Sequence, residues 1–248
     1  MIRFFRNIRQ QLLGEGKTGK YLKYALGEIL LVMIGILLAL QVNNWNEQRK
    51  ESIKETYYLN SIQTSIRLSQ DELSRVINDA ALISSSADTL FNLIAVNKTD
   101  QLKGFFLDSL LYMAGDYSRI SLNDGGVQEV LNAGNLDIIK DDRIRIFLAS
   151  WNDRLHKIRK FEEETEYRAR QYQEYLKYFM DEKKFITNTN ASQGVVIPEK
   201  KTQLFQDPLL TNYLASIAGI HEGMHQMYTN ERKVMDSLSV LIVNYLKQ

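Results

Sequence analysis

The most apolar stretch of the chain lies near its N-terminus. Residues 24–42 read YALGEILLVMIGILLALQV, and positions 29–40 carry no polar side chain. At 1.5 Å per residue, a helix of this length covers roughly 28 Å, close to the thickness of a hydrocarbon core. Tyr24 and Trp45 flank it, as interfacial aromatic rings do. The pattern predicts a transmembrane helix at 24–42.

After this stretch, apolar residues recur at alternating spacings of three and four, as in a heptad repeat. Three such series predict long helices at about 46–96, 141–181 and 208–245. In the second helix Glu162 interrupts the series, which suggests looser or wetter packing there. The first series consists of Leu59, Ile62, Ile66, Ser69, Leu73, Val76, Ala80, Ile83, Ala87, Leu90 and Ile94. The third consists of Tyr213, Ile217, Ile220, Met224, Met227, Glu231, Val234, Leu238, Leu241 and Tyr245.

Shorter elements connect these helices. We expect a short helix at about 101–113 and another ending near Asn132, capped by Asn123 or Asp124. Gly134 suits a left-handed helix stop, and 186–207 reads as a loop containing a brief, unpaired strand at 194–197. The fold class is therefore all-α: an N-terminal transmembrane helix followed by an elongated antiparallel bundle with coiled-coil-like seams, spanning 43–248.

Charge gives the membrane segment a direction. Six Lys or Arg residues against one Glu give residues 1–23 a net charge of +5, so the rest of the chain carries −4 of the total +1. The positive-inside rule then predicts a cytoplasmic tail at 1–23 and an extracytoplasmic domain from 43 onward. A cleaved signal peptide is the rival interpretation, but Ala39-Leu40-Gln41 does not fit a small-x-small cleavage site. Residues 2–13 form either an amphipathic helix on an anionic leaflet or a merely basic tail.

Three positions in or beside the span attract attention besides Trp45. Glu28 is ionisable, and such residues within spans are costly and often functional. It either reaches the interface, or is protonated, or contacts a partner helix. Gly35 and Ala39 form a small-xxx-small step that lets a second helix approach closely.

Composition excludes several classes of function. The net charge of +1 argues against nucleic-acid binding. The absence of cysteine excludes disulfides, thiolate metal sites and cysteine nucleophiles. We expect no cofactor.

One segment resembles a catalytic motif. His221-Glu222-Gly223-Met224-His225 matches HExxH, which on a helix places two histidines one turn apart for zinc and Glu222 as a general base. The heptad pattern, however, turns His221, Glu222 and His225 toward solvent, while Glu231 lies on the inner seam. A catalytic zinc also needs a third ligand. A solvated helix face is therefore expected; the alternatives are a zinc metallopeptidase and an adventitious metal site.

The remaining polar or aromatic clusters have plainer explanations. Residues 14–21 nearly match a phosphate-binding loop, but no strand precedes them, so a basic hinge is expected. Glu162, Glu163, Glu164 and Glu166 read as a solvated face. An aromatic stripe reads either as core or as an exposed binding patch, and it consists of Tyr167, Tyr172, Tyr175, Tyr178 and Phe179.

Two stretches carry a family resemblance. Residues 16–47 read GKTGKYLKYALGEILLVMIGILLALQVNNWNE, and residues 131–140 read LNAGNLDIIK, followed by Arg143 and Leu148. Together they resemble an uncharacterised family of single-pass membrane proteins abundant in Bacteroidota. The resemblance implies a location in the bacterial envelope, at the inner membrane, and no chemistry.

These observations lead to one functional hypothesis. We expect a non-enzymatic periplasmic helical protein that acts as an interaction, scaffold or sensor-like module. Its expected partners are the lipid bilayer and either another protein or a second copy of the chain. About 23 cytoplasmic residues leave no room for an output domain, so a signal would have to pass to a partner.

Overall fold

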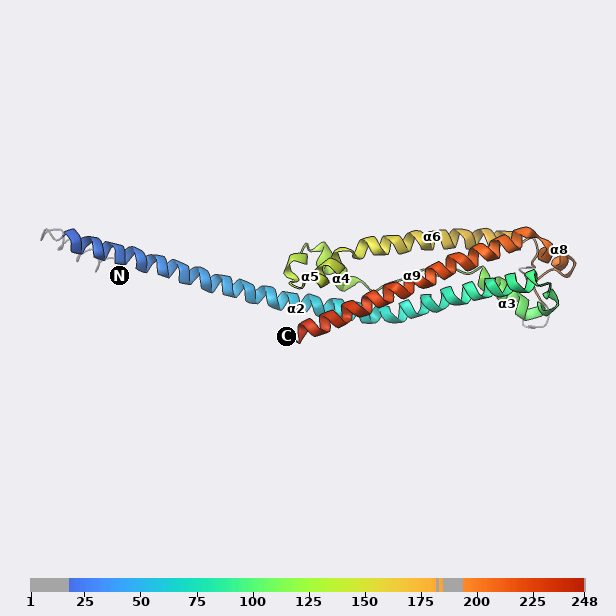
Figure 1. The fold of residues 1–248 in the computed structure, drawn as a ribbon, viewed down its shortest axis with the longest axis horizontal. Helices are drawn as coiled ribbons and strands as arrows, with labels where there is room; N and C mark the ends of the chain where they lie inside the picture. The colour runs from blue at the N-terminus through green and yellow to red at the C-terminus, as the bar shows by residue number, and fades with distance from the viewer. Residues whose placement is uncertain (1–17, 182, 185–193, 248) are drawn as a thin grey trace. The chain divides into compact units, whose positions relative to one another are not determined.

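The computed structural model describes residues 18–181, 183–184 and 194–247, and the chain divides into two compact units, residues 1–56 and 57–248. One long helix, α2 (Thr18–Ala95), contributes to both units (Figure 1). The expected tail helix at 2–13 and the first residues of the expected hinge lie outside the described residues. The start of α2 at Thr18 makes the predicted span and the predicted helix at 46–96 parts of one helix.

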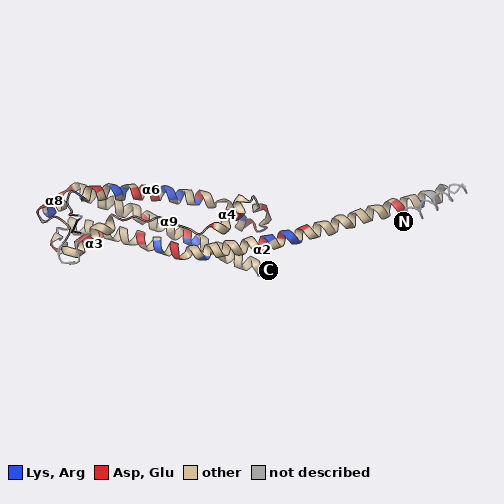
Figure 2. Cartoon of the chain, turned by 180° about the vertical axis from the view of Figure 1, so that it is seen from behind, with Lys and Arg blue, Asp and Glu red and all other residues tan. Residues whose placement is uncertain are grey.

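The first unit contains the apolar part of α2. Its side chains are exposed over a window long and apolar enough to cross a membrane. The sequence has no Lys, Arg, Asp or Glu between Glu28 and Glu47, and Figure 2 shows a long uncharged stretch of α2, drawn in tan. Gly35, Ala39 and Trp45 are exposed, whereas Glu28 is half-buried. This long apolar helix is suited to serve as a membrane anchor.

The second unit is an antiparallel helical bundle. The chain runs along α2, returns through two short helices, runs forward again and then returns along the last helix (Figure 1). Its other helices are α3 (Gly104–Ala114), α4 (Gly125–Asn132), α5 (Asp142–Ala149), α6 (Trp151–Leu176), α8 (Lys201–Gln206) and α9 (Pro208–Leu246). Short 3-10 turns lie at Thr99–Gln101, Leu136–Ile138 and Pro198–Lys200. The described residues form no β-strand, apart from an isolated bridge between Met180 and Val196.

Two hydrophobic clusters form the core of this unit. One joins α2, α4, α5 and the adjoining parts of α6 and α9, including Trp151 and Tyr228. The other joins α2, α3, α8 and the opposite parts of α6 and α9, including Tyr172. All eleven residues of the first predicted series on α2 are buried, so the prediction for that helix is confirmed residue by residue.

The predicted series on α9 alternates between two positions of the heptad, and only one of these two positions is buried as predicted. Ile217, Met224, Glu231 and Leu238 are buried as predicted. The intervening buried positions are His221, Tyr228, Met235 and Ile242, each one residue later than predicted. Because both registers fit a spacing of three and four, the apolar pattern did not distinguish them.

The returning leg between α3 and α4 has no regular secondary structure at 116–124. Its backbone groups therefore need partners from other helices. Glu162 accepts a 2.7 Å hydrogen bond from Ile120 N, Glu72 accepts one of 2.9 Å from Ser121 N, and Ser69 Oγ accepts one of 3.0 Å from Asn123 N. Polar side chains of α2 and α6 thus form hydrogen bonds with the backbone of this segment between α3 and α4.

Glu162 is 0% exposed, so the prediction of a solvated face is wrong for it. Its carboxylate also accepts hydrogen bonds of 2.8 Å from Tyr228 Oη and from Arg159 Nη1. Together with Ile120 N, these donors give both oxygens of the Glu162 carboxylate hydrogen-bond partners within the bundle. Glu163 and Glu164 are exposed, as predicted.

The helix predicted at 141–181 is divided and shorter. Ser150 lies between α5 and α6, and its Oγ donates to Phe147 O at 2.8 Å, which competes with the helical backbone. Beyond Leu176, backbone hydrogen bonds join Phe179 and Asp181 to the segment 195–197. In place of the expected unpaired strand at 194–197, Val196 forms an isolated bridge with Met180. Part of the expected loop is the helix α8.

Several helix ends follow the predicted chemistry. Asp141 caps α5 by accepting from Arg143 N and Ile144 N, and Gly134 has a φ of 65°. Asp124 precedes α4 but makes no capping bond. Its carboxylate instead accepts hydrogen bonds from Gln128 Nε2 and Trp151 Nε1.

Candidate functional site: a groove between α6 and α9

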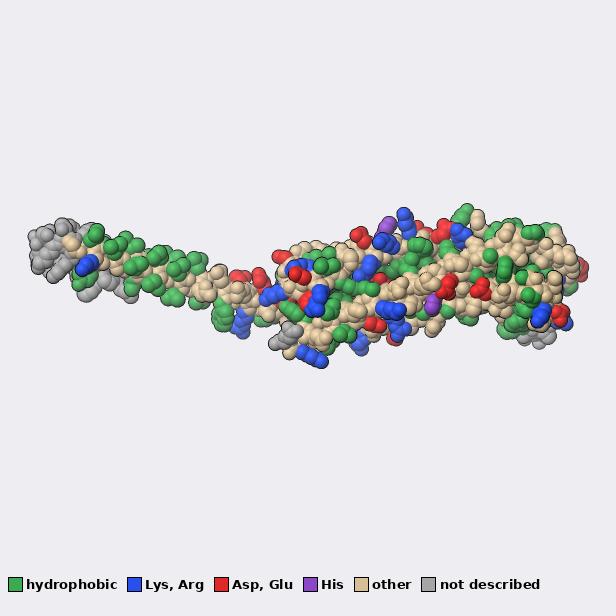
Figure 3. All heavy atoms as spheres, in the orientation of Figure 1, with side chains coloured by type: hydrophobic (Ala, Val, Ile, Leu, Met, Phe, Trp, Pro, Cys, Tyr) green, Lys and Arg blue, Asp and Glu red, His purple; other side chains and the backbone are tan. Residues whose placement is uncertain are grey.

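An open, mostly apolar groove of about 500 Å³ lies between α6 and α9. A volume of this size is typical of small-molecule sites, which combine apolar walls with a few polar groups. Figure 3 shows hydrophobic side chains gathered between these helices, with Lys and Arg beside them. The lining residues on α6 are Arg154, Lys157, Ile158 and Phe161, and those on α9 are Gly223, Gln226, Met227, Asn230, Glu231 and Val234.

Arg154 is the most constrained charged residue of the groove. Its guanidinium lies 3.9 Å from the centre of the Phe147 ring and donates to Glu231 Oε1 at 3.1 Å. Its Nε is buried and finds no hydrogen-bond acceptor among the described residues. The Arg154 side chain as a whole is 21% exposed, and it lines the groove.

The Arg154–Glu231 pair is held in a partly dry environment. Burial lowers the pKa of Arg154 and raises that of Glu231, in each case against the opposing effect of the partner's charge. Both shifts indicate that the pair does not fully compensate the loss of water. Perturbed titratable groups beside a hollow are a recognised marker of functional sites.

The HExxH segment borders this groove through Gly223. His221 is 4% exposed, so the prediction that it faces solvent is wrong; burial lowers its pKa to about 4, against the opposing charge of Asp116. Glu222 is exposed and accepts a 2.9 Å hydrogen bond from Gln226 Nε2, and His225 is half-buried. One histidine therefore belongs to the core.

The donor set around these histidines does not fit a zinc centre. Among the described residues, no group of three or more His, Cys, Asp or Glu side chains is placed to hold a metal ion. Glu231, which is also on α9, is already paired with Arg154. A catalytic zinc requires three protein ligands with one position open, and the segment supplies at most two.

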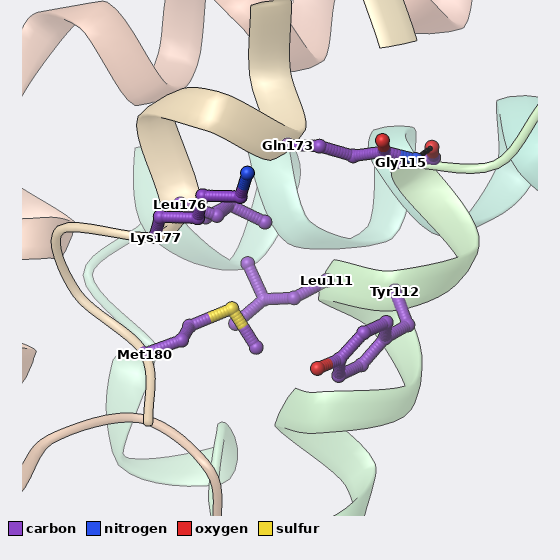
Figure 4. Close-up of a pocket in the computed structure, with 7 residues that line it drawn as sticks. All are labelled: Leu111, Tyr112, Gly115, Gln173, Leu176, Lys177 and Met180. Atoms are coloured by element: carbon purple, nitrogen blue, oxygen red, sulfur yellow. Dashed lines mark hydrogen bonds between the residues drawn. The ribbon is translucent and has the colours of Figure 1, made fainter. Parts of the chain in front are cut away.

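Other hollows also lie in this unit. A cavity of about 160 Å³ lies between α3 and the end of α6, and Figure 4 shows Leu111 and Met180 pointing toward each other across it. It is also lined by Gly115, whose carbonyl accepts from Gln173 Nε2 at 2.7 Å. Such a volume suits a ligand about as large as benzene.

Another is a shallow aromatic surface on α6 and α9, near α8. It is lined by Tyr167, Arg170, Gln171, Glu174, Tyr175, Leu209 and Tyr213. Tyr172 and Phe179 are buried, whereas Tyr167 and Tyr178 are more than half exposed. The aromatic stripe is therefore divided between core and surface.

Sequence reasoning missed the groove. Arg154 follows Trp151 by three residues and so lies beside the predicted seam. Nothing in the residue pattern showed that α9 does not cover Arg154 completely. The residues singled out in the span, Glu28, Gly35, Ala39 and Trp45, belong to the first unit and not to this groove.

A protein-family model described as a family of unknown function (DUF6090) matches residues 28–157, just over half of the chain. The match begins within the apolar segment and ends within α6. No curated protein and no solved structure matches the chain.

Proposed function

The chain belongs to DUF6090, a family of unknown function, and from its own residues we propose that it is a membrane-anchored, non-enzymatic interaction module of the bacterial envelope. The anchor is the segment 24–42 of α2. The tail before it lies in the cytoplasm and the helical bundle in the periplasm, so the protein spans the inner membrane once.

One observation carries this proposal. The apolar stretch of α2 is fully exposed, although exposing so much apolar surface to water is strongly unfavourable. A lipid bilayer removes that surface from water without a protein partner. The cationic tail that precedes it favours one orientation, because Lys and Arg are retained on the cytoplasmic side.

The aromatic surface supports the interaction role. Tyr167 is 58% exposed and Leu209 is 46% exposed. Tyrosine and arginine are enriched among the residues that anchor protein interfaces, and Arg170 adjoins Tyr167 here. A scaffold or sensor role would use this surface to contact another envelope protein.

Membrane fractionation and reporter fusions test the anchor. The full chain should stay with membranes after an alkaline carbonate wash, and a version with Leu31, Ile34 and Leu38 changed to Asp should be released. A periplasm-active phosphatase fused after Gln248 should be active in the full chain. Two outcomes would overturn the proposed topology. One is a full chain that is released from membranes, and the other is a phosphatase that is active when fused before the span and inactive when fused after Gln248.

Site-specific crosslinking tests the interaction role. A photo-reactive amino acid at Tyr167 should capture one defined protein reproducibly in living cells. The matched position is Lys233, which is exposed on α9 and outside the aromatic surface. Equal capture from both positions would count against a specific partner at this surface.

A further inference from the structure

The groove between α6 and α9 has both the apolar walls and the charge of a site for an amphiphile. Phe161, which lines it, is 46% exposed, an unfavourable state that a ligand's apolar body would relieve. On α9 the lining runs from Gly223 to Val234, which is roughly 16 Å of helix. An elongated apolar groove suits a single chain better than a compact ring system.

The charged residues of the groove set the sign and size of the ligand's charge. Arg154 and Lys157 contribute two positive charges and Glu231 contributes one negative charge, so one positive charge remains to be balanced. A carboxylate carries one negative charge, whereas a phosphate monoester carries nearly two at neutral pH. The planar guanidinium of Arg154 also matches a carboxylate in geometry.

We propose that this groove binds a long-chain fatty acid, with the carboxylate at Arg154 and Lys157 and the acyl chain along Phe161, Met227 and Val234. Arg154 lines the groove with 21% of its side chain exposed, so a ligand can reach this residue. The inference rests on the proposed function, because an anchored bundle lies beside a bilayer that supplies such acids.

Trp151 provides a local reporter of binding. The chain has two tryptophans, Trp45 and Trp151, so Trp45→Phe leaves Trp151 alone. The Trp151 ring centre is 5.5 Å from the guanidinium carbon of Arg154. The full chain with Trp45→Phe would be placed in phosphatidylcholine nanodiscs and titrated with bromine-labelled stearate, whose bromine atoms quench nearby indole fluorescence. The uncharged methyl ester controls for partitioning into the lipid.

The chain offers a matched pair of blocking variants. Apart from adjacent residues and the backbone of α9 itself, no described atom lies within 4 Å of a Cβ built on Gly223 or on Gly219. Both positions therefore accept a side chain, and leucine favours a helix more than glycine does. Only Gly223 lines the groove. Gly223→Leu should fill the groove, while Gly219→Leu adds the same side chain one turn earlier, outside the lining.

The expected result is saturable quenching of Trp151 by the acid and little by the ester. Gly223→Leu should abolish the saturable quenching, and Gly219→Leu should retain it. Arg154→Gln should weaken binding about tenfold or more, as loss of a charged hydrogen bond does. Equal quenching by acid and ester, or unchanged quenching in Gly223→Leu, would overturn the proposal.

The outcomes separate this inference from the proposed function. If the chain integrates into membranes but the acid does not quench Trp151 specifically, only the fatty-acid site fails. If the chain is not an integral membrane protein, the anchor proposal fails, and the same titration in buffer still decides whether the groove binds the acid.

Discussion

Tyr228 on α9 donates a 2.8 Å hydrogen bond to Oε1 of Glu162 on α6, and both side chains are almost completely buried. The same oxygen accepts from Ile120 N at 2.7 Å. One carboxylate thus joins two long helices to the irregular leg of the bundle. Burial is the main cause that raises the pKa of Tyr228, and the charge of Glu162 and the hydrogen bond to Glu162 raise it further.

Replacing Glu162 tests how much this junction contributes. Glu162→Ala leaves the Ile120 amide and the Tyr228 hydroxyl buried without an acceptor, so we expect the free energy of unfolding to fall by about 3 kcal/mol. Urea unfolding of the full chain, followed by Trp151 fluorescence, measures the change. Glu163→Ala is the control, because Glu163 is exposed, and it should change stability by about 0.5 kcal/mol or less. Equal effects would mean that Glu162 does not hold the leg.

This junction also shows what the sequence could not reveal. Every position that the spacing on α2 predicted to be buried is buried, because apolar side chains with a fixed repeat report which face packs. The spacing did not predict the buried Tyr58 or Ser84, which lie outside the series. Glu162 interrupted its predicted series, and Ser69 is a polar member of the series on α2. They are buried because an irregular segment, 42 and 54 residues away in the chain, brings its backbone against them, and no periodicity reports such a contact. The groove was missed for a related reason: it depends on how two helices separate.

A glycine pair tests the close packing of α4 on α2. A Cβ on Gly126 would lie 2.6 Å from the backbone of Ser61, whereas one on Gly125 would meet no described atom within 4 Å apart from adjacent residues and the backbone of α4 itself. Gly126→Ala should therefore reduce the free energy of unfolding by about 2–3 kcal/mol, through displacement of the helix backbone. Gly125→Ala should be neutral or slightly stabilising. The same urea titration applies, and a neutral Gly126→Ala would show that α4 does not pack as described.

Acid should destabilise the bundle through His221. Burial lowers its pKa from 6.5 to about 4, so between these pH values the unfolded chain binds more protons than the folded one. The free energy of unfolding should therefore fall as the pH drops through this window, by roughly 3 kcal/mol in total, and the full contribution should be present above it.

Comparison of variants isolates this effect. Burial raises the pKa of Glu231 and of Asp108, and raised carboxyl pKa values act in the opposite direction as the pH falls. The pH dependence of the free energy of unfolding should therefore be measured for the full chain and for two variants. It should be flatter in His221→Gln and unchanged in His225→Gln. A slope that is identical in His221→Gln would show that His221 is not held neutral.

Zinc content provides the direct test of the HExxH segment. Full-length protein purified without a histidine tag should contain much less than one zinc per chain by elemental analysis, because buried His221 and half-buried His225 are joined by no third ligand among the described residues. His221→Ala/His225→Ala should show the same background. About one zinc per chain that is lost in the double variant would contradict this expectation, and the general-base role of Glu222 would then be tested with Glu222→Gln in a peptidase assay.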